Sequence, residues 1–335
     1  MASSLLNPLR PKPFRGDVIA AGVVVLATLV WVVRARFGGV WGSGGLLAFA
    51  AVPWAFVTLL AVLAPMEREE PRAYQSVLYV SSVALAIAVL LSLSQVLGME
   101  RWSAPATTAI FAVLAALSFF FAVARNSAVC TFVGALGGGV AAVALFIWIV
   151  SPDNDAAFRW LLLALMLAYT LGAVAQRDRH LRHGVALIDA AGVAVVTLAT
   201  SFVPIFTFFF DFHDGDIDAD AYSGTWAACF SLSGACASDV SVGWGWELVI
   251  LAAGFGLVAY SSIDRQPGPA YFGVVTLGLS ALVISADHGP ATLIGWPLIL
   301  AVAAAILLAI GLRPSTPAPP PPDIDAPEPP PLPLR

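Results

Sequence analysis

The chain has 335 residues, of which 59% are hydrophobic and 11% charged, and its mean hydropathy is +0.88. A soluble domain is about a quarter charged, so this composition excludes a single water-facing globule. The formal net charge is −5, and no basic patch interleaved with aromatic residues is present, so we expect no nucleic-acid partner. The apolar residues come in blocks long enough to cross a bilayer. The sequence therefore predicts an all-α, polytopic membrane helix bundle in contact with lipid.

Residues 1–16 form a short basic segment that precedes the first apolar run, Asp17–Val33. This run is longer than the apolar region of a usual signal peptide. Arg-Ala-Arg follows it, where cleavage would need small residues. We therefore expect a retained first helix, preceded by a cytoplasmic N-terminus.

Ten spans are predicted within a membrane domain of residues 17–312, most of them about 20 residues long, as a hydrocarbon core of about 30 Å requires. They are Asp17–Val33, Trp41–Ala64, Ala73–Leu97, Pro105–Ala124, Ala128–Val150, Ala156–Gln176, Val185–Phe210, Gly243–Ile263, Ala270–Ala286 and Ala291–Leu312. Only three residues separate the fourth span from the fifth. We expect a tight helical hairpin there, and one long broken helix is the alternative.

The basic residues support this count. If both termini are cytoplasmic, the ten-span topology places twelve Lys and Arg residues inside and only Arg34, Arg36, Arg101 and Arg159 outside. Such an excess is typical of the cytoplasmic side of membrane proteins. The chain has a single lysine, Lys12, and is rich in Ala, Gly and Val. This bias indicates a GC-rich bacterial genome, and hence a bacterial plasma (inner) membrane.

Polar residues follow one side of the seventh span, Val185–Phe210. At about 100° per residue, Thr200 and Thr207 fall within roughly 20° of Asp189, and Thr197 and Pro204 within roughly 80°. Intramembrane carboxylates mark solute pathways, so these five residues are candidates for a transport path. The alternative is structural: Asp189 lies near the start of the span, where the helix dipole favours an anion and Arg182 can reach it.

An acidic loop, residues 211–242, follows this span and is predicted to face outward. Its carboxylates suit calcium, and Asp214, Asp216, Asp218 and Asp220 are candidate ligands for a calcium ion. The register does not fit an EF-hand, because Ala219 and Thr225 stand where glycine and glutamate are needed. A solvated acidic loop is the alternative, and no other cofactor is expected.

Cys229 and Cys236 lie in the same loop, and an oxidising exterior favours a disulfide between them. Two free thiols are the alternative, because spacing alone does not establish connectivity.

The C-terminal tail, residues 313–335, contains eleven prolines and is expected to be disordered or extended in the cytoplasm. It is either a ligand for an aromatic-lined protein partner or simply a solvated tail.

The basic loop between the sixth and seventh spans contains His180 and His183 among three arginines. Their positive charge disfavours a metal, so we interpret the loop as an anchor for lipid phosphates. The sequence contains no nucleotide-binding glycine loop, HExxH, GxSxG or CxxC motif, and we expect no enzymatic activity.

In gross architecture, ten spans with both ends inside resemble the drug/metabolite transporter superfamily, which is built from two five-helix halves. Ten-helix membrane acyltransferases are similar in layout but depend on an early histidine, and the first histidine here is His180. The composition resembles that of uncharacterised actinobacterial integral membrane proteins. The leading hypothesis is a permease for a small solute. The alternative is a non-transporting scaffold that binds partners through the acidic loop and the tail, and an intramembrane transferase comes third.

Overall fold

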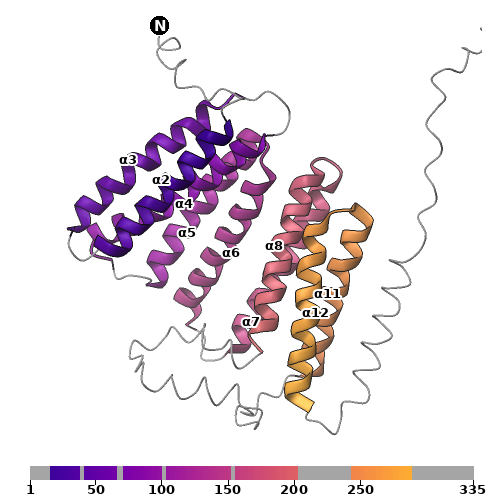
Figure 1. Ribbon diagram of the computed structural model, residues 1–335. Helices are drawn as coiled ribbons and strands as arrows, with labels where there is room; N and C mark the ends of the chain where they lie inside the picture. The colour runs from indigo at the N-terminus through magenta and orange to yellow at the C-terminus, as the bar shows by residue number, and fades with distance from the viewer. Residues whose placement is uncertain are drawn as a thin grey trace, which may run out of the picture. The chain divides into compact units, whose positions relative to one another are not determined.

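The computed structural model describes residues 16–37, 41–65, 71–99, 103–151, 155–202 and 243–288. Within these residues the secondary structure is entirely helical (Figure 1). The helices are α2 (Gly16–Phe37), α3 (Ser43–Leu63), α4 (Ala73–Val96), α5 (Ala104–Arg125), α6 (Ala128–Val150), α7 (Asp155–Arg177), α8 (Leu181–Thr200), α11 (Trp244–Asp264) and α12 (Pro267–His288). Eight of them, α2 to α8 and α11, are long and apolar enough to cross a membrane. The protein is therefore a multi-pass integral membrane protein.

Nine of the ten predicted spans correspond to these helices, and the tenth, Ala291–Leu312, lies outside the described residues. The predicted hairpin between the fourth and fifth spans is confirmed. Asn126 ends α5 in the left-handed conformation (φ 49°, ψ 42°), which asparagine tolerates better than most residues. Ser127 then caps α6 by accepting a hydrogen bond from the Cys130 amide (3.5 Å).

Successive helices run in opposite directions, so alternate connections meet at the same face of the bundle. The Arg125 guanidinium at the end of α5 donates to the carbonyls of Val62 and Ala64 at the end of α3. His183 of α8 bonds Asn126 in the α5–α6 turn. Arg177 at the end of α7 pairs with Asp264 at the end of α11. We call this side the arginine-rich face.

The predicted grouping of arginines is confirmed for the residues that the structure describes. Six lie at the arginine-rich face and three at the opposite ends of the helices. The first set is Arg72, Arg125, Arg177, Arg179, Arg182 and Arg265, and the second is Arg34, Arg36 and Arg159. That the arginine-rich face is cytoplasmic stays a prediction from the positive-inside rule.

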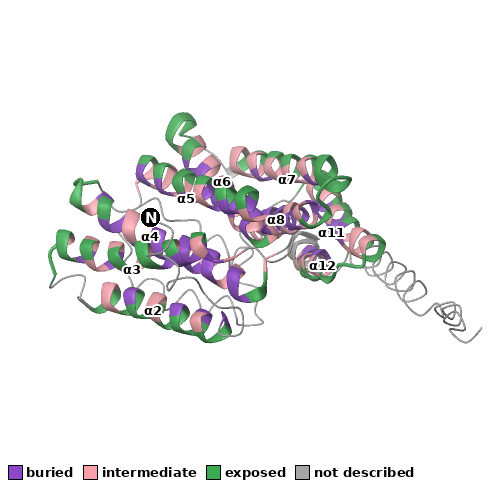
Figure 2. Cartoon of the chain, turned by 90° about the horizontal axis from the view of Figure 1, so that it is seen from above, coloured by how far each residue is buried: buried purple, intermediate pink, exposed green. Residues whose placement is uncertain are grey.

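Two helices, α4 and α8, occupy the centres of two helix groups, and both are largely buried (Figure 2). The first group, α2 to α5, packs around α4 through a cluster that includes Leu78, Tyr79, Leu85 and Phe121. The second group comprises α7, α8, α11 and α12. Its cores are built around Leu198 and Ile250 near the opposite face and around Ile188 and Leu257 nearer the arginine-rich face.

Helix α6 packs between the two groups, and its glycines allow close contact on both sides. A Cβ on Gly137 would stand 3.5 Å from the backbone of α5, at Ala115 N and Phe111 O. A Cβ on Gly139 would stand 2.6 Å from the hydroxyl of Tyr169 in α7. The Tyr169 hydroxyl donates to the carbonyl of Ala135 (2.6 Å). The small-residue run in α6 therefore serves helix packing, as such runs do in membranes.

The predicted start of the seventh span is wrong. Helix α8 begins at Leu181, four residues before Val185, and ends at Thr200, and residues 203–210 of the predicted span lie outside the described residues. Ser201 and Phe202 form a turn. Hydropathy marks where the apolar run begins, whereas a helix can extend beyond it into the interface.

Candidate functional site

Asp189 lies where α8 meets the beginning of α12. It is the ninth residue of α8, roughly 12 Å from the helix start at 1.5 Å per residue, so the dipole of its own helix no longer supports it. Instead, its carboxyl group packs against Gly268. A Cβ on Gly268 would stand 2.7 Å from Asp189 Oδ1 and 2.8 Å from Oδ2. Only glycine therefore allows this approach.

Among the described residues, one oxygen of the Asp189 carboxyl group lacks the partner that a buried carboxylate oxygen normally has. Its Oδ1 is buried and forms no hydrogen bond within the described part of the chain. The first turn of α12 has the sequence Pro-Gly-Pro-Ala, and its two prolines have no amide hydrogen. A helix start normally offers several free amides to an anion, but this one offers fewer.

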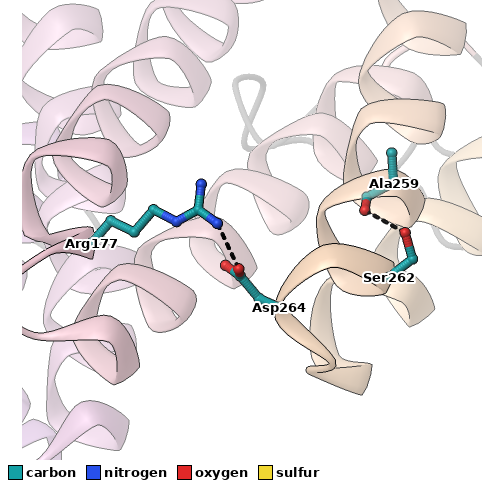
Figure 3. Close-up of polar contacts among 4 residues, drawn as sticks. All are labelled: Arg177, Ala259, Ser262 and Asp264. Carbon is teal, nitrogen blue, oxygen red and sulfur yellow. Dashed lines mark hydrogen bonds and ion pairs between the residues drawn. The ribbon is translucent and has the colours of Figure 1, made fainter.

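An ion pair lies beside Asp189 at the arginine-rich face. Arg177 Nη2 donates to Asp264 Oδ1 at 2.7 Å, which joins the ends of α7 and α11 (Figure 3). The Asp264 side chain is 7% exposed and that of Arg177 is 46% exposed. The Arg177 guanidinium carbon lies 5.9 Å from the Tyr260 ring centroid. Arg177 is therefore already engaged by α11.

Buried polar groups continue from Asp189 toward the opposite face. Thr276 and Ser280 of α12 are fully buried, and they follow Gly268 by roughly 12 and 18 Å at 1.5 Å per residue. Leu279, beside Ser280, packs on the cluster that contains Ile250 of α11. Glu247 of α11 is 1% exposed and lies one turn before Ile250. We call Asp189, Thr276, Ser280 and Glu247 the polar column.

Thr276 and Ser280 are satisfied within their own helix. Thr276 donates to the Phe272 carbonyl at 2.8 Å, and Ser280 donates to the Leu277 carbonyl at 2.7 Å. Their hydroxyl oxygens keep acceptor capacity, so these residues can bind a passing donor without leaving a buried group unsatisfied. The sequence gives no sign of the roles of Thr276 and Gly268, because these roles depend on the packing of α12.

Thr197 and Thr200 share one side of α8 with Asp189, as predicted. Both are half-buried, and this is the least buried side of α8. The Thr197 hydroxyl donates to the Val193 carbonyl (2.9 Å), and that of Thr200 donates to the Thr197 carbonyl (2.8 Å). They line the flank of the helix without bonding another helix, so the polar column follows α12 rather than this flank.

His183 forms a link that the sequence did not predict. Its Nε2 lies 2.8 Å from Asn126 Oδ1, and its Nδ1 is hydrogen-bonded to the Thr131 hydroxyl. With the proton on Nε2, His183 donates to Asn126 and accepts from Thr131. The histidine thus joins α8 to the α5–α6 turn.

Several predicted residues lie outside the described residues: Pro204, Thr207, Asp214, Asp216, Asp218, Asp220, Cys229 and Cys236. The transport-path, calcium and disulfide assignments that involve them stay predictions. Among the residues that the structure does describe, no three His, Cys, Asp or Glu side chains are grouped to hold a metal ion.

Comparisons with known proteins do not assign the chain to a family. No family model matches the chain, and neither a curated protein nor a solved structure is significantly similar to it. The likeness to actinobacterial membrane proteins therefore rests on composition and architecture.

Proposed function

We propose that the protein is a permease that moves a small solute or ion along the polar column between α8, α11 and α12. The observation that carries the proposal is the placement of the column's members. Asp189 lies toward the arginine-rich face, Glu247 lies toward the opposite face, and two buried hydroxyls lie on α12 between these levels. Polar groups inside a bilayer are costly, and they occur where a path needs them.

In this proposal the arginine-rich face is cytoplasmic, the membrane is a bacterial inner membrane, and no covalent reaction is assigned. The scaffold is the alternative. It is favoured by the half-buried flank of Thr197 and Thr200, whose hydroxyls bond only their own helix. A scaffold needs no water in the bundle, whereas a permease needs water to reach the column. Water access therefore distinguishes the two functions.

The test is cysteine accessibility in membrane vesicles. We would replace the native Cys130, Cys229 and Cys236 by serine and introduce Thr276→Cys or Ser280→Cys. A small water-soluble methanethiosulfonate reagent reacts with thiolates in water and not with thiols in hydrocarbon. We expect both new cysteines to react.

Val274→Cys is the matched control, because Val274 lies on the same helix and its side chain is 63% exposed on the surface of the chain, where the proposed topology places lipid. It should not react. If cysteines at positions 276 and 280 are as unreactive as the one at 274, water does not reach the column. The permease hypothesis is then wrong, and the scaffold hypothesis replaces it.

A further inference from the structure

We propose that Asp189 is a reversible proton-binding site and that the proton is the ion whose movement drives the permease. The inference rests on the proposed function and names its coupling ion. In the binding step a hydronium ion gives its proton to a carboxylate oxygen of Asp189 and leaves as water. In the release step water takes the proton back.

The first argument is the state of the carboxyl group in the structure. Within the described residues, Asp189 Oδ1 is buried without a hydrogen bond, and both carboxyl oxygens lie within 2.8 Å of the position that a Cβ on Gly268 would take. An ionised carboxylate would leave this oxygen both charged and unsatisfied in a medium of low dielectric constant, which is costly. A protonated carboxyl group carries no net charge and fits the same space. The close packing therefore favours the protonated form, and ionisation favours movement of the carboxylate away from α12.

The charged and titratable groups around Asp189 leave it without a paired cation. On α7 the nearest is Arg177, which is bound to Asp264 of α11 at 2.7 Å. Tyr260 of α11 packs on the cluster that contains Ile188, next to Asp189. The other charged or titratable groups on α8 and the adjoining helices lie in the first turn of α8 or elsewhere on α6, α7, α11 and α12. They are Arg182 and His183 on α8, Cys130 on α6, Asp155, Arg159 and Tyr169 on α7, Glu247 on α11, and Tyr271, Asp287 and His288 on α12.

A proton fits this site better than a metal cation. A metal ion needs several oxygen ligands, and the described residues contain no cluster of acidic or histidine side chains around Asp189. A proton needs one oxygen and removes the negative charge completely.

Movement of α12 would couple protonation to the polar column. Gly268, Thr276 and Ser280 belong to the same helix, so a shift of its first turn changes the position of both hydroxyls. Pro267 begins this turn directly after the α11–α12 connection. Protonation of Asp189 would thus bias the arrangement of the column without any contact between the proton and the solute.

The test is labelling with dicyclohexylcarbodiimide in membranes that contain the full chain. This reagent adds the O–H of a protonated carboxyl group across a C=N bond, without a leaving group, and favours apolar surroundings. We expect mass spectrometry to find the label on Asp189 at neutral pH, and the label should decrease as the pH is raised. Sodium at constant pH should leave it unchanged. Exposed Asp178 and ion-paired Asp264 should remain unlabelled.

Two glycine variants test the geometry. Gly268→Ala places a methyl group against both carboxyl oxygens and should reduce labelling severalfold, because the group must move toward water. Gly278→Ala has open space around it on the same helix and should leave labelling unchanged. No label on Asp189, or protection by sodium, would overturn the proton site. If Asp189 is labelled but the cysteines at positions 276 and 280 are unreactive, the proton site is supported and the permease function is contradicted. Failure of the proton site and failure of the permease function are therefore distinguishable.

Discussion

The two helix groups share one plan and differ in chemistry. Each surrounds a central buried helix, α4 in the first and α8 in the second (Figure 2). Helices α3 to α6 contain no acidic residue. The second group has Asp189 in α8 and Glu247 and Asp264 in α11. Arg177 of α7 forms the ion pair with Asp264. The acidic side chains inside the described spans are thus concentrated around α8.

Polar groups around α4 are largely matched with one another. Thr58 and Ser82 share a hydrogen bond of 2.7 Å between α3 and α4. Gln75 donates to the Pro65 carbonyl (2.7 Å) and accepts from the Arg72 amide (2.8 Å), which closes the turn before α4. Arg34 of α2 donates to the carbonyl of Ala88 (3.2 Å) and to Ser92. These bonds fix the positions of the helices relative to one another.

In the proposed permease, the first group is the support and the second carries the activity. A matched hydroxyl adds rigidity, whereas a buried carboxyl group without a partner costs stability unless it has a use. If this division is right, a packing substitution in one group should not disturb the core of the other group. Substitutions of the ion-paired residues should destabilise only the second group.

The largest expected effect is from Gly273→Val at the crossing of α11 and α12. A Cβ there would stand 2.7 Å from Val258 Cγ2 and 2.8 Å from the Gly254 carbonyl oxygen, so the two backbones must separate. Overpacking of this kind costs about 1–3 kcal/mol. We expect a lower melting temperature in detergent. Gly278→Ala, which meets no atom within 4 Å, is the control and should melt like the wild type.

The same variant tests whether the groups are independent. Cys130 is 1% exposed in the core of the first group. In a background with the other two cysteines replaced, it should stay unreactive to thiol reagents in Gly273→Val below the melting transition. Reaction of Cys130 under those conditions would show that damage to the second group spreads to the first, which contradicts the division.

An intermediate effect is expected from Arg177→Gln, which leaves the buried Asp264 carboxylate without its partner. Breaking a fully buried ion pair costs about 3–5 kcal/mol. Because Arg177 is 46% exposed, water screens the pair, and we expect about 1–2 kcal/mol in the free energy of unfolding. Adding Asp264→Asn should restore most of this loss in a double-mutant cycle. A double variant as unstable as Arg177→Gln would contradict the pairing.

Much of the fold follows from local sequence, because a span of about 20 apolar residues and a cluster of arginines are both visible without tertiary information. The turn at Asn126 can be predicted in the same way, because only three residues separate the two apolar spans there. The start of α8 at Leu181 was missed because hydropathy does not report where backbone hydrogen bonds begin. The contact between Asp189 and Gly268, and the link through His183, join segments far apart in the sequence, and no periodicity reveals them.

The smallest expected effect is from Tyr79→Phe at the centre of the first group. The Tyr79 hydroxyl is fully buried without a hydrogen bond in the described residues, and its ring stacks on Phe121 with centroids 5.1 Å apart. Removing the hydroxyl keeps the ring and relieves an unsatisfied polar group, so the free energy of unfolding should stay level or rise by up to about 1 kcal/mol. Tyr169→Phe is the contrast. The Tyr169 hydroxyl donates to the Ala135 carbonyl, so its removal should lower the free energy of unfolding by about 1 kcal/mol. Equal losses in the two variants would mean that the Tyr79 hydroxyl has a partner, and that α4 also carries a polar site in need of explanation.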